Sequence, residues 1–345
     1  MKKNSLLLFL LIIILSACKP DIQKPRILTV MTHDSFSVSE DLIRKFEEEN
    51  DIVLKFLEAG DTGTALNKAI LSKNSPLADV FYGVDNTFLS RALDENIFLP
   101  YESKFLSDIP ENFILDPEYH ALPVDYGDIC FNYDVAFFEE NDIPHINSLD
   151  DLLKPEYKNL IVVQNPATSS PGLGFLFLTI SQYGDPGYLK FWEGLIKNNV
   201  KVVNDWESAY YSEFSRWGGT RPIVLSYSSS PPFEVIFSEE SIDKPPTKAI
   251  TSNGTCYRQI EFVGILKGTK NRGFAEEFVD FMLSTEFQED IPLQMYVFPV
   301  NQTAILDETF IKYLEIPESP AMLSPSEIAA HREDWINTWT DNVLR

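Results

Sequence analysis

The chain has 345 residues, of which 28 are lysine or arginine and 52 are aspartate or glutamate, so its formal net charge is -24. This balance argues against a nucleic-acid-binding protein and against docking on anionic lipid through a basic patch, because both need clustered positive charge. A hydrophobic content of 44% excludes a disordered acidic tail, and 3 cysteines are too few for a disulfide-built scaffold. The length is typical of about two domains or lobes.

The N-terminus has the order of features found in a secretion signal. Two lysines precede an apolar run from Leu6 to Leu15, which is too short to span a membrane comfortably. The sequence Leu15-Ser-Ala-Cys18 follows, and it resembles the lipobox of bacterial lipoproteins, in which the cysteine is lipid-modified.

The lipobox resemblance implies a membrane-anchored protein outside the cytoplasm, in the periplasm or at the cell surface. Residues 1–17 are predicted to be a lipoprotein signal peptide, Cys18 the lipidation site and residues 18–25 a tether. An ordinary cleaved signal or a short anchor is the alternative.

Hydrophobic periodicity predicts alternating strands and helices from residue 26 onward. Short β-branched and apolar runs predict strands, and apolar residues at helical spacing predict helices. In chain order these are a strand at 26–30, a helix at 37–49, a strand at 52–57, a helix at 64–72, a strand at 78–82 and a helix at 87–94. Such alternation is typical of right-handed crossovers in a mostly parallel sheet.

A long extended stretch at 122–133 leads into a second α/β region. Its predicted elements are a strand at 159–163, helices at 172–183 and 188–197, a strand at 200–203, a helix at 206–217 and a strand at 222–227. A second extended run at 259–267 is a candidate return to the first lobe, before predicted helices at 273–283, 285–290 and 325–343.

Two lobes joined by two extended crossings suit a binding protein that closes around a ligand by hinge bending. The predicted first lobe is discontinuous, 26–124 and 260–345, and the second lobe is 125–259. One large doubly wound sheet with insertions remains an alternative that periodicity does not exclude.

Two loops that follow predicted strands carry acids. Asp34 follows the first strand and Asp61 the second. Loops at the carboxyl ends of strands face the ligand crevice of an open α/β sheet, so both acids could meet a polar or cationic group. Asp and Gly in such loops also make turns and cap helices, which leaves that alternative open.

Three segments of the second region combine hydroxyls with aromatic rings. Ser169 and Ser170 precede a predicted helix, whose free N–H groups could bind a phosphate or another acceptor, unless Ser170 is only its cap. Trp206 stands between a strand and a helix, where it could stack on a ring, contact a cation or plug the core. The run Leu225–Phe233 is a hydroxyl-rich turn between Tyr227 and Phe233, which could line a site or be inert surface.

Taken in order, these segments resemble the thiamine-binding substrate-binding proteins of bacterial ABC importers. The matching stretches run from about Leu28 to Arg345. They are Thr32-His-Asp-Ser-Phe36, Ala78-Asp79, Gly83-Val-Asp-Asn86, Pro123-Val-Asp-Tyr-Gly127, Thr168–Gly174, Trp206–Tyr210, Leu225–Pro231, Pro299-Val300 and Ser324–Trp335.

The resemblance implies an α/β fold of the bilobed type II periplasmic-binding-protein class, with two doubly wound lobes joined by extended hinge segments. It implies a receptor for thiamine, thiamine monophosphate or thiamine diphosphate. Its partners would be an ABC transporter permease and ATPase complex. We expect a monomer without a cofactor or catalytic group, bound to the membrane only through the lipid anchor.

The resemblance also assigns ligand-binding residues. Asp61 and Thr62 would lie at the polar end of the ligand, although the family often has glycine in place of Thr62. Asp34 is the expected partner for the aminopyrimidine or the cation. Ser169 and Ser170 would bond the phosphate or hydroxyethyl end.

Aromatic and hydroxyl residues would surround the ring system. Trp206 would contact a ring, and the same face would be lined by Tyr227, Ser228, Ser229, Ser230 and Pro231. Phe233 and Tyr296 stand where the family is expected to have Tyr and Trp, and both keep a stacking face.

Three other functions are alternatives to this one. A ferric-ion receptor could use Tyr210 and Tyr211 with His33 and Glu58. A polyamine receptor would need several acids in the cleft and would not use the hydroxyls at Ser169. A hydrolytic enzyme is disfavoured because no Gly-x-Ser-x-Gly or His-Glu-x-x-His motif occurs, and the four histidines lack metal-ligand spacing.

The cysteines near the two crossings leave a question open. Cys130 and Cys256 could form a disulfide or remain two buried thiols, and sequence spacing does not decide between these states.

Overall fold

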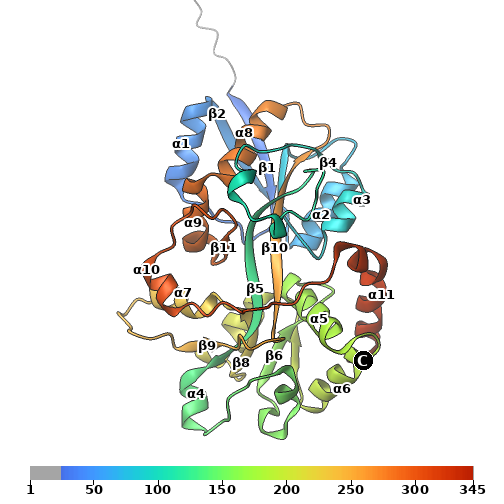
Figure 1. Cartoon of the computed structure of the whole chain (residues 1–345), viewed down its shortest axis with the longest axis vertical. Coiled ribbons are helices and arrows are strands. Elements are labelled where there is room, and N and C mark those ends of the chain that lie inside the picture. The colour runs from blue at the N-terminus through green and yellow to red at the C-terminus, as the bar shows by residue number, and fades with distance from the viewer. Residues whose placement is uncertain (1–24, 345) are drawn as a thin grey trace, which may run out of the picture.

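The computed structural model describes residues 25–344, so the predicted signal peptide, Cys18 and all but the last residue of the predicted tether lie outside the described part. Figure 1 shows two lobes, with the strands β5 (Leu122–Asp134) and β10 (Cys256–Leu266) running from one into the other. These are the two extended crossings that the sequence predicts.

The first lobe is built from both ends of the chain. Its elements are β1 (Arg26–Thr32), α1 (Glu40–Asn50), β2 (Ile52–Glu58), α2 (Thr62–Leu71), β3 (Val80–Asp85), α3 (Leu89–Asp94), β4 (Phe98–Leu99), α8 (Arg272–Leu283) and α9 (Thr285–Met295). Short 3-10 helices η1 (Leu106–Asp108) and η2 (Glu111–Phe113) precede β5. The elements predicted for 26–94 are all present, with ends shifted by a few residues.

The second lobe follows β5. Its elements are α4 (Val135–Glu140), η3 (Leu149–Leu153), η4 (Pro155–Tyr157), β6 (Ile161–Gln164), α5 (Ser170–Tyr183), α6 (Gly187–Lys197), β7 (Lys201–Val203), η5 (Ser208–Glu213), η6 (Ser215–Trp217), β8 (Ile223–Tyr227), α7 (Ser230–Ile236) and β9 (Thr247–Ala249). The chain ends with β11 (Phe298–Pro299), α10 (Glu308–Tyr313) and α11 (Pro325–Val343).

Two local predictions in the second lobe are wrong. The predicted helix at 206–217 is interrupted, because η5 is a π-helix that stops where Phe214 takes an extended backbone, before the 3-10 helix η6. The turn predicted within Leu225–Phe233 is confined to Ser228 and Ser229, and α7 begins at Ser230. Its prolines look like a turn in the sequence, but proline is well tolerated in the first turn of a helix.

The sheet is mixed, with the order β2-β1-β3-β10-β5-β8-β6-β7. The strands β1, β2 and β3 pair in parallel, as do β6, β7 and β8. At the centre, β10 runs antiparallel to β3 and β5, and β5 runs antiparallel to β8. The prediction of a mostly parallel sheet is therefore wrong at the crossings. There β5 runs antiparallel to β8 of the second lobe, and β10 runs antiparallel to β3 of the first lobe.

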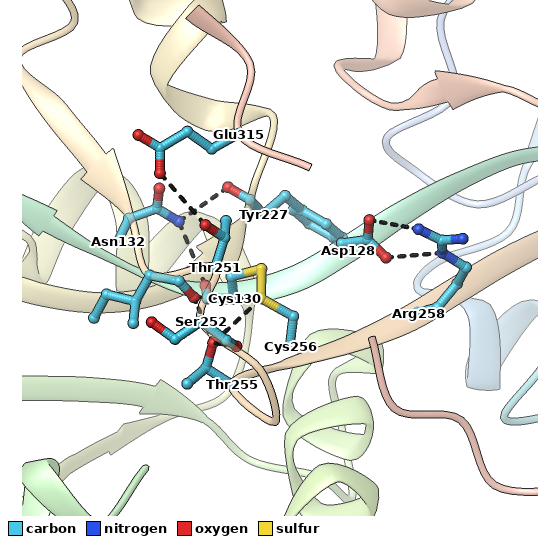
Figure 2. Close-up of a disulfide and its surroundings, with 11 residues drawn as sticks. Asp128, Cys130, Asn132, Tyr227, Thr251, Ser252, Thr255, Cys256, Arg258 and Glu315 are labelled. Carbon is cyan, nitrogen blue, oxygen red and sulfur yellow. Dashed lines mark hydrogen bonds and ion pairs between the residues drawn. A yellow bond between two sulfur atoms is a disulfide. The ribbon is translucent and has the colours of Figure 1, made fainter. Parts of the chain in front are cut away.

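The crossing strands face each other residue by residue. In their antiparallel register Glu261 is opposite Asp125, Arg258 opposite Asp128 and Cys256 opposite Cys130. Cys130 and Cys256 form a disulfide, which answers the question that the sequence leaves open. Figure 2 shows this bond beside the ion pair in which Arg258 Nε and Nη2 donate to Asp128 at 2.9 and 2.8 Å.

The C-terminal helix α11 contacts both lobes. Trp335 packs on Phe177 of α5, with ring centroids 5.7 Å apart, and the guanidinium of Arg332 lies 4.2 Å from the ring centroid of Phe88 in the first lobe. Packing alone does not allot α11 to one lobe, so its assignment to the first lobe stays a prediction. Within residues 25–344, none of the helices combines the length and the apolar character needed to cross a membrane.

Candidate functional site

The candidate site lies where the carboxyl ends of the parallel strands of both lobes meet. In the first lobe β1, β2 and β3 end at Thr32, Glu58 and Asp85. In the second lobe the helix starts at Ser170 and Ser230 follow β6 and β8. Ligand crevices of α/β sheets form at such strand ends, where loops and helix N-termini converge.

The two halves of the site are in direct contact. Ser229 Oγ donates a hydrogen bond of 2.7 Å to the carbonyl of Tyr296. The Tyr227 ring lies over Gly127 of the crossing strand, where a Cβ would stand 2.8 Å from the ring. A side chain at position 127 would therefore displace Tyr227, which explains why glycine occupies this point of the crossing.

Four carboxyl groups gather at this junction, and we call Asp61, Asp85, Asp125 and Glu261 the acidic centre. Asp85 and Asp125 are fully buried and Glu261 nearly so. All four act on the buried phenol of Tyr227, whose pKa burial and then these neighbouring carboxylates raise well above its ordinary value. The acidic centre thus joins first-lobe, crossing-strand and second-lobe residues.

Hydrogen bonds organise the acids on the crossing strands. Tyr82 Oη lies 2.5 Å from Asp125 Oδ2 and 3.0 Å from Glu261 Oε2. His33 Nε2 lies 3.5 Å from Glu261 Oε1. The Tyr82 hydroxyl therefore bridges the carboxyl groups of Asp125 and Glu261, and the His33 imidazole lies beside Glu261.

The pKa values of Asp125, Glu261 and His33 shift in different senses. Burial and then Glu261 raise the pKa of Asp125 well above its ordinary value. Burial acts to raise the pKa of Glu261 too, but the interaction with His33 leaves it lowered. Burial lowers the pKa of His33, and Glu261 outweighs this and raises it. These directions favour the protonated form of Asp125 and the charged forms of Glu261 and His33.

The two predicted acids of the first lobe lie on adjacent loops. Asp34 is exposed and its Oδ1 accepts a 2.8 Å hydrogen bond from the backbone N–H of Gly60. Asp61 stands at the N-cap position of α2 but makes no side-chain capping bond, and Thr62 behind it is buried. Burial raises the pKa of Asp61 to about 6. Asp61, and not Asp34, belongs to the acidic centre.

The predicted hydroxyls at the start of α5 are not used by the helix. Ser169 is the N-cap residue and makes no side-chain capping bond. Ser170 is buried, and its Oγ has no hydrogen-bond partner. The Ser170 hydroxyl nevertheless acts on Asp85, where it and Thr87 partly offset the effect of burial. The helix start therefore keeps free N–H and O–H groups beside the acidic centre.

The turn after β8 places its hydroxyls in three different ways. Ser228 is fully buried with an unpartnered Oγ, Ser229 bonds Tyr296, and Ser230 Oγ lies 2.9 Å from Ser226 Oγ. Pro231 is buried in the first turn of α7. These residues thus lie together near the lobe junction, and their contact with a ligand stays a prediction.

The two predicted stacking rings are in contact but differ in exposure. Phe233 is buried and packs on Tyr296, with ring centroids 4.7 Å apart, and on Phe310. Tyr296 is 40% exposed and follows α9 with a positive φ of 61°. The Tyr296 ring is therefore partly accessible, whereas the Phe233 ring is buried against it.

Trp206 lies at the edge of the second lobe, after β7. It is partly exposed, stacks on Tyr210 and donates a 2.9 Å hydrogen bond from Nε1 to Ser226 Oγ. Trp206 also packs against the small buried cluster that contains Tyr210 and Phe214, so its contacts fit a core residue as well as a ligand-binding one.

Sequence reasoning did not propose Asp85, Asp125 or Glu261 as site residues. A usable signal was present for Asp125 and Glu261, because each is a charged residue in a predicted extended crossing, and acids are seldom buried without a partner. Asp85 lies beyond the predicted strand at 78–82 and had no such signal. His33 was considered only as an iron ligand, and in the structure it pairs with Glu261.

The iron alternative finds little support in the geometry. Among residues 25–344, no group of three or more His, Cys, Asp or Glu side chains is arranged to hold a metal ion. Tyr210 is buried and donates to Glu234, while Tyr211 is 48% exposed. Burial and Glu234 raise the pKa of Tyr210 well above its ordinary value, which opposes a phenolate ligand.

Comparison with known proteins gives one consistent result. The family model of the bacterial extracellular solute-binding proteins matches residues 75–312. The chain is 32% identical to the thiamine-binding periplasmic protein of Escherichia coli, over 96% of this chain and 98% of that protein. It is 31% identical to the thiamine-binding periplasmic protein of Brucella suis, over 98% of each chain.

Solved structures agree on the fold. A periplasmic thiamin binding protein has a TM-score of 0.80 at 27% identity, covering 94% of this chain and 98% of that one. A ferric binding protein from Campylobacter jejuni has a TM-score of 0.74 at 20% identity, covering 91% and 99%, and it shares the fold alone. The architecture is that of the type II periplasmic binding proteins, which confirms the fold predicted from the sequence.

Proposed function

The chain belongs to the bacterial extracellular solute-binding proteins, and from this premise we propose that it captures thiamine and delivers it to an ABC importer. It is an extracytoplasmic binding protein and not an enzyme. The observation that carries the choice of ligand is the full-length similarity to thiamine-binding proteins, together with an acidic centre that a cation would complement.

The chemistry of thiamine fits the residues at the lobe junction. Thiamine has a permanent thiazolium charge beside a neutral aminopyrimidine ring and a hydroxyethyl arm. Asp61 and Glu261 would offset the positive charge. Trp206 and Tyr296 would contact the rings, and the free hydroxyls of Ser169 and Ser170 would bond the hydroxyethyl end.

Thiamine diphosphate is proposed as the weaker ligand. Thiamine diphosphate carries net negative charge, and both the acidic centre and the overall charge of -24 oppose it. The N-terminus of α5 would have to outweigh that repulsion. We therefore expect thiamine or thiamine monophosphate to bind more tightly than the diphosphate.

Attachment to the membrane through Cys18 remains part of the proposal. The lipobox-like Leu15-Ser-Ala-Cys18 supports it. Cys18→Ser should release the protein from the membrane fraction and abolish labelling by a radioactive fatty acid. If the variant fractionates and is labelled like the natural protein, Cys18 is not the anchor.

Calorimetry on the untagged mature protein tests the ligand. We expect saturable one-to-one binding of thiamine and recovery of the ligand chemically unchanged. Spermidine and ferric citrate are the matched probes for the polyamine and iron alternatives. Absence of heat with thiamine and with both phosphates at saturating concentration would reject the proposal, and binding of either probe instead would replace it.

A further inference from the structure

We propose that Glu234 is a positioning residue that fixes the ligand-facing ring of Trp206 through Tyr210. The inference rests on the proposed function, in which Trp206 contacts the ring system of the ligand. It adds a residue of α7 that does not itself meet the ligand.

Tyr210 covers one face of Trp206. The two rings are stacked, with centroids 4.9 Å apart and planes 18° apart. Tyr210 is 4% exposed, whereas Trp206 is partly exposed. Since Tyr210 occupies one face, the exposed part of Trp206 lies on the side away from it.

Two further contacts hold the Trp206 ring in place. Tyr211 meets it edge-on, with centroids 5.5 Å apart at 84°, and Trp206 Nε1 donates to Ser226 Oγ. The π-helix η5 presents Tyr210 inward and its neighbour Tyr211 outward, yet both rings contact Trp206. Single wide helical turns of this kind are frequent at functional sites.

Glu234 accepts a hydrogen bond from the hydroxyl of Tyr210. Its side chain is 5% exposed, Oε1 accepts the hydrogen bond from the Tyr210 hydroxyl, and Oε2 lies 3.5 Å from Arg216 Nε. Burial, followed by the effect of Glu234, keeps the pKa of Tyr210 well above its ordinary value, so the phenol stays a donor. Burial raises the pKa of Glu234, while the Tyr210 hydroxyl and Arg216 act to lower it. In its ionised form Glu234 makes a stronger and more directional hydrogen bond than a neutral acceptor would.

A chain of contacts therefore runs from Glu234 of α7 through Tyr210 to the partly exposed Trp206. A ring that is already fixed in its bound orientation loses less freedom when ligand binds, which increases affinity without a new ligand contact. The carboxylate would also make the stacked pair more electron-rich, which favours a cationic ring.

Coupled substitutions test this role in thiamine titrations. Glu234→Ala and Tyr210→Phe should each weaken thiamine binding about tenfold, the equivalent of one lost charge-assisted hydrogen bond. Glu234→Gln keeps an acceptor oxygen and should restore part of the affinity. Glu213→Ala is the matched control, because this acid of the same π-helix pairs with Lys201 and should leave affinity unchanged.

The decisive comparison adds Trp206→Ala. If Glu234 acts through Trp206, then Glu234→Ala should have no further effect on affinity in a chain that already carries Trp206→Ala. An equal tenfold loss in both backgrounds, or no loss in the natural background, would overturn the proposal.

A spectroscopic readout separates this inference from the identity of the ligand. The stacked Trp206–Tyr210 pair should contribute a near-ultraviolet circular dichroism band that Trp206→Phe removes. Glu234→Ala should remove the same band while the far-ultraviolet spectrum is unchanged. If the natural protein does not bind thiamine, the proposed function fails, yet loss of this band would still support the positioning role and its persistence would overturn it.

Discussion

Asp85 is the residue at which burial and charge conflict most directly. Its Oδ1 accepts hydrogen bonds from the backbone N–H and the hydroxyl of Thr87, at 2.8 and 2.5 Å, but its buried Oδ2 has no partner. Burial raises the pKa of Asp85 to about 6, even though the hydroxyls of Thr87 and Ser170 act to lower it. Ionisation of Asp85 therefore costs free energy in the folded protein.

The conflict predicts a pH dependence of stability. Because the folded pKa lies above the ordinary 3.8, the folded chain binds the proton more tightly than the unfolded chain. The free energy of unfolding should therefore fall as pH rises from about 4 to about 6, and stay lower above that. Asp85→Asn keeps an acceptor for Thr87 and cannot ionise, so it should gain at most about 3 kcal/mol over the natural protein at pH 8 and nothing at pH 4.

Urea unfolding at a series of pH values measures this difference. Asp94→Asn is the matched control, since Asp94 is an exposed acid at the end of α3. Its profile should parallel that of the natural protein. A parallel profile for Asp85→Asn as well would show that ionisation of Asp85 does not oppose folding.

Single-residue reasoning recovered part of the site. Asp61 was found because acids in loops after strands face a crevice, a rule that uses only neighbouring sequence. Asp125 and Glu261 were missed because their proximity arises from the antiparallel register of two strands far apart in the chain. Sequence alone does not give that register, so the pairing could not be foreseen.

At the scale of elements, serine occupies the N-cap position of both α1 and α11 but makes a capping hydrogen bond only in α11. Ser324 begins α11 with a capping box, in which its hydroxyl accepts from the Glu327 N–H and the Glu327 carboxylate accepts from the Ser324 N–H. Ser39 holds the corresponding position before α1 but makes no side-chain capping bond.

The contrast predicts unequal effects of one substitution. Ser324→Ala should lower the free energy of unfolding by about 1 kcal/mol, whereas Ser39→Ala should change it by much less. Thermal or urea unfolding of the two variants measures both values. Equal losses would mean that the capping box contributes nothing specific to α11.

Periodicity found the long helices and strands because their apolar spacing is regular over many residues. It failed at η5 and α7, where the deciding features are a π-turn at Tyr210 and two prolines that fit a first helical turn. The mixed sheet was missed for a related reason, since strand direction at the crossings depends on where the chain returns. Local sequence does not contain that information.

On the scale of the whole molecule, the acid excess acts at long range. The net charge is -24, and the acidic centre places part of the negative charge where the lobes meet. A cation approaching this surface is attracted over a distance that shrinks from about 30 Å at 0.01 M salt to about 3 Å at 1 M. Most of the other acids lie at the surface and add to this general field.

This field predicts a salt effect on association. The association rate constant of thiamine should fall several-fold between about 0.01 M and about 0.5 M salt, as for other electrostatically assisted encounters. Thiamine diphosphate, with net negative charge, should show the opposite trend. Stopped-flow tryptophan fluorescence measures both, and a common trend for the two ligands would show that the field does not steer them.

The disulfide between the crossing strands links the covalent state of the protein to its compartment. The cytoplasm keeps thiols reduced, whereas extracytoplasmic compartments allow disulfides to form and persist. We therefore expect Cys130 and Cys256 to be thiols in the cytoplasm and their bond to form only after export. A copy of the chain retained in the cytoplasm would have its two crossings joined by hydrogen bonds and side-chain pairs alone, and would differ chemically from the exported protein at the strands that join the lobes.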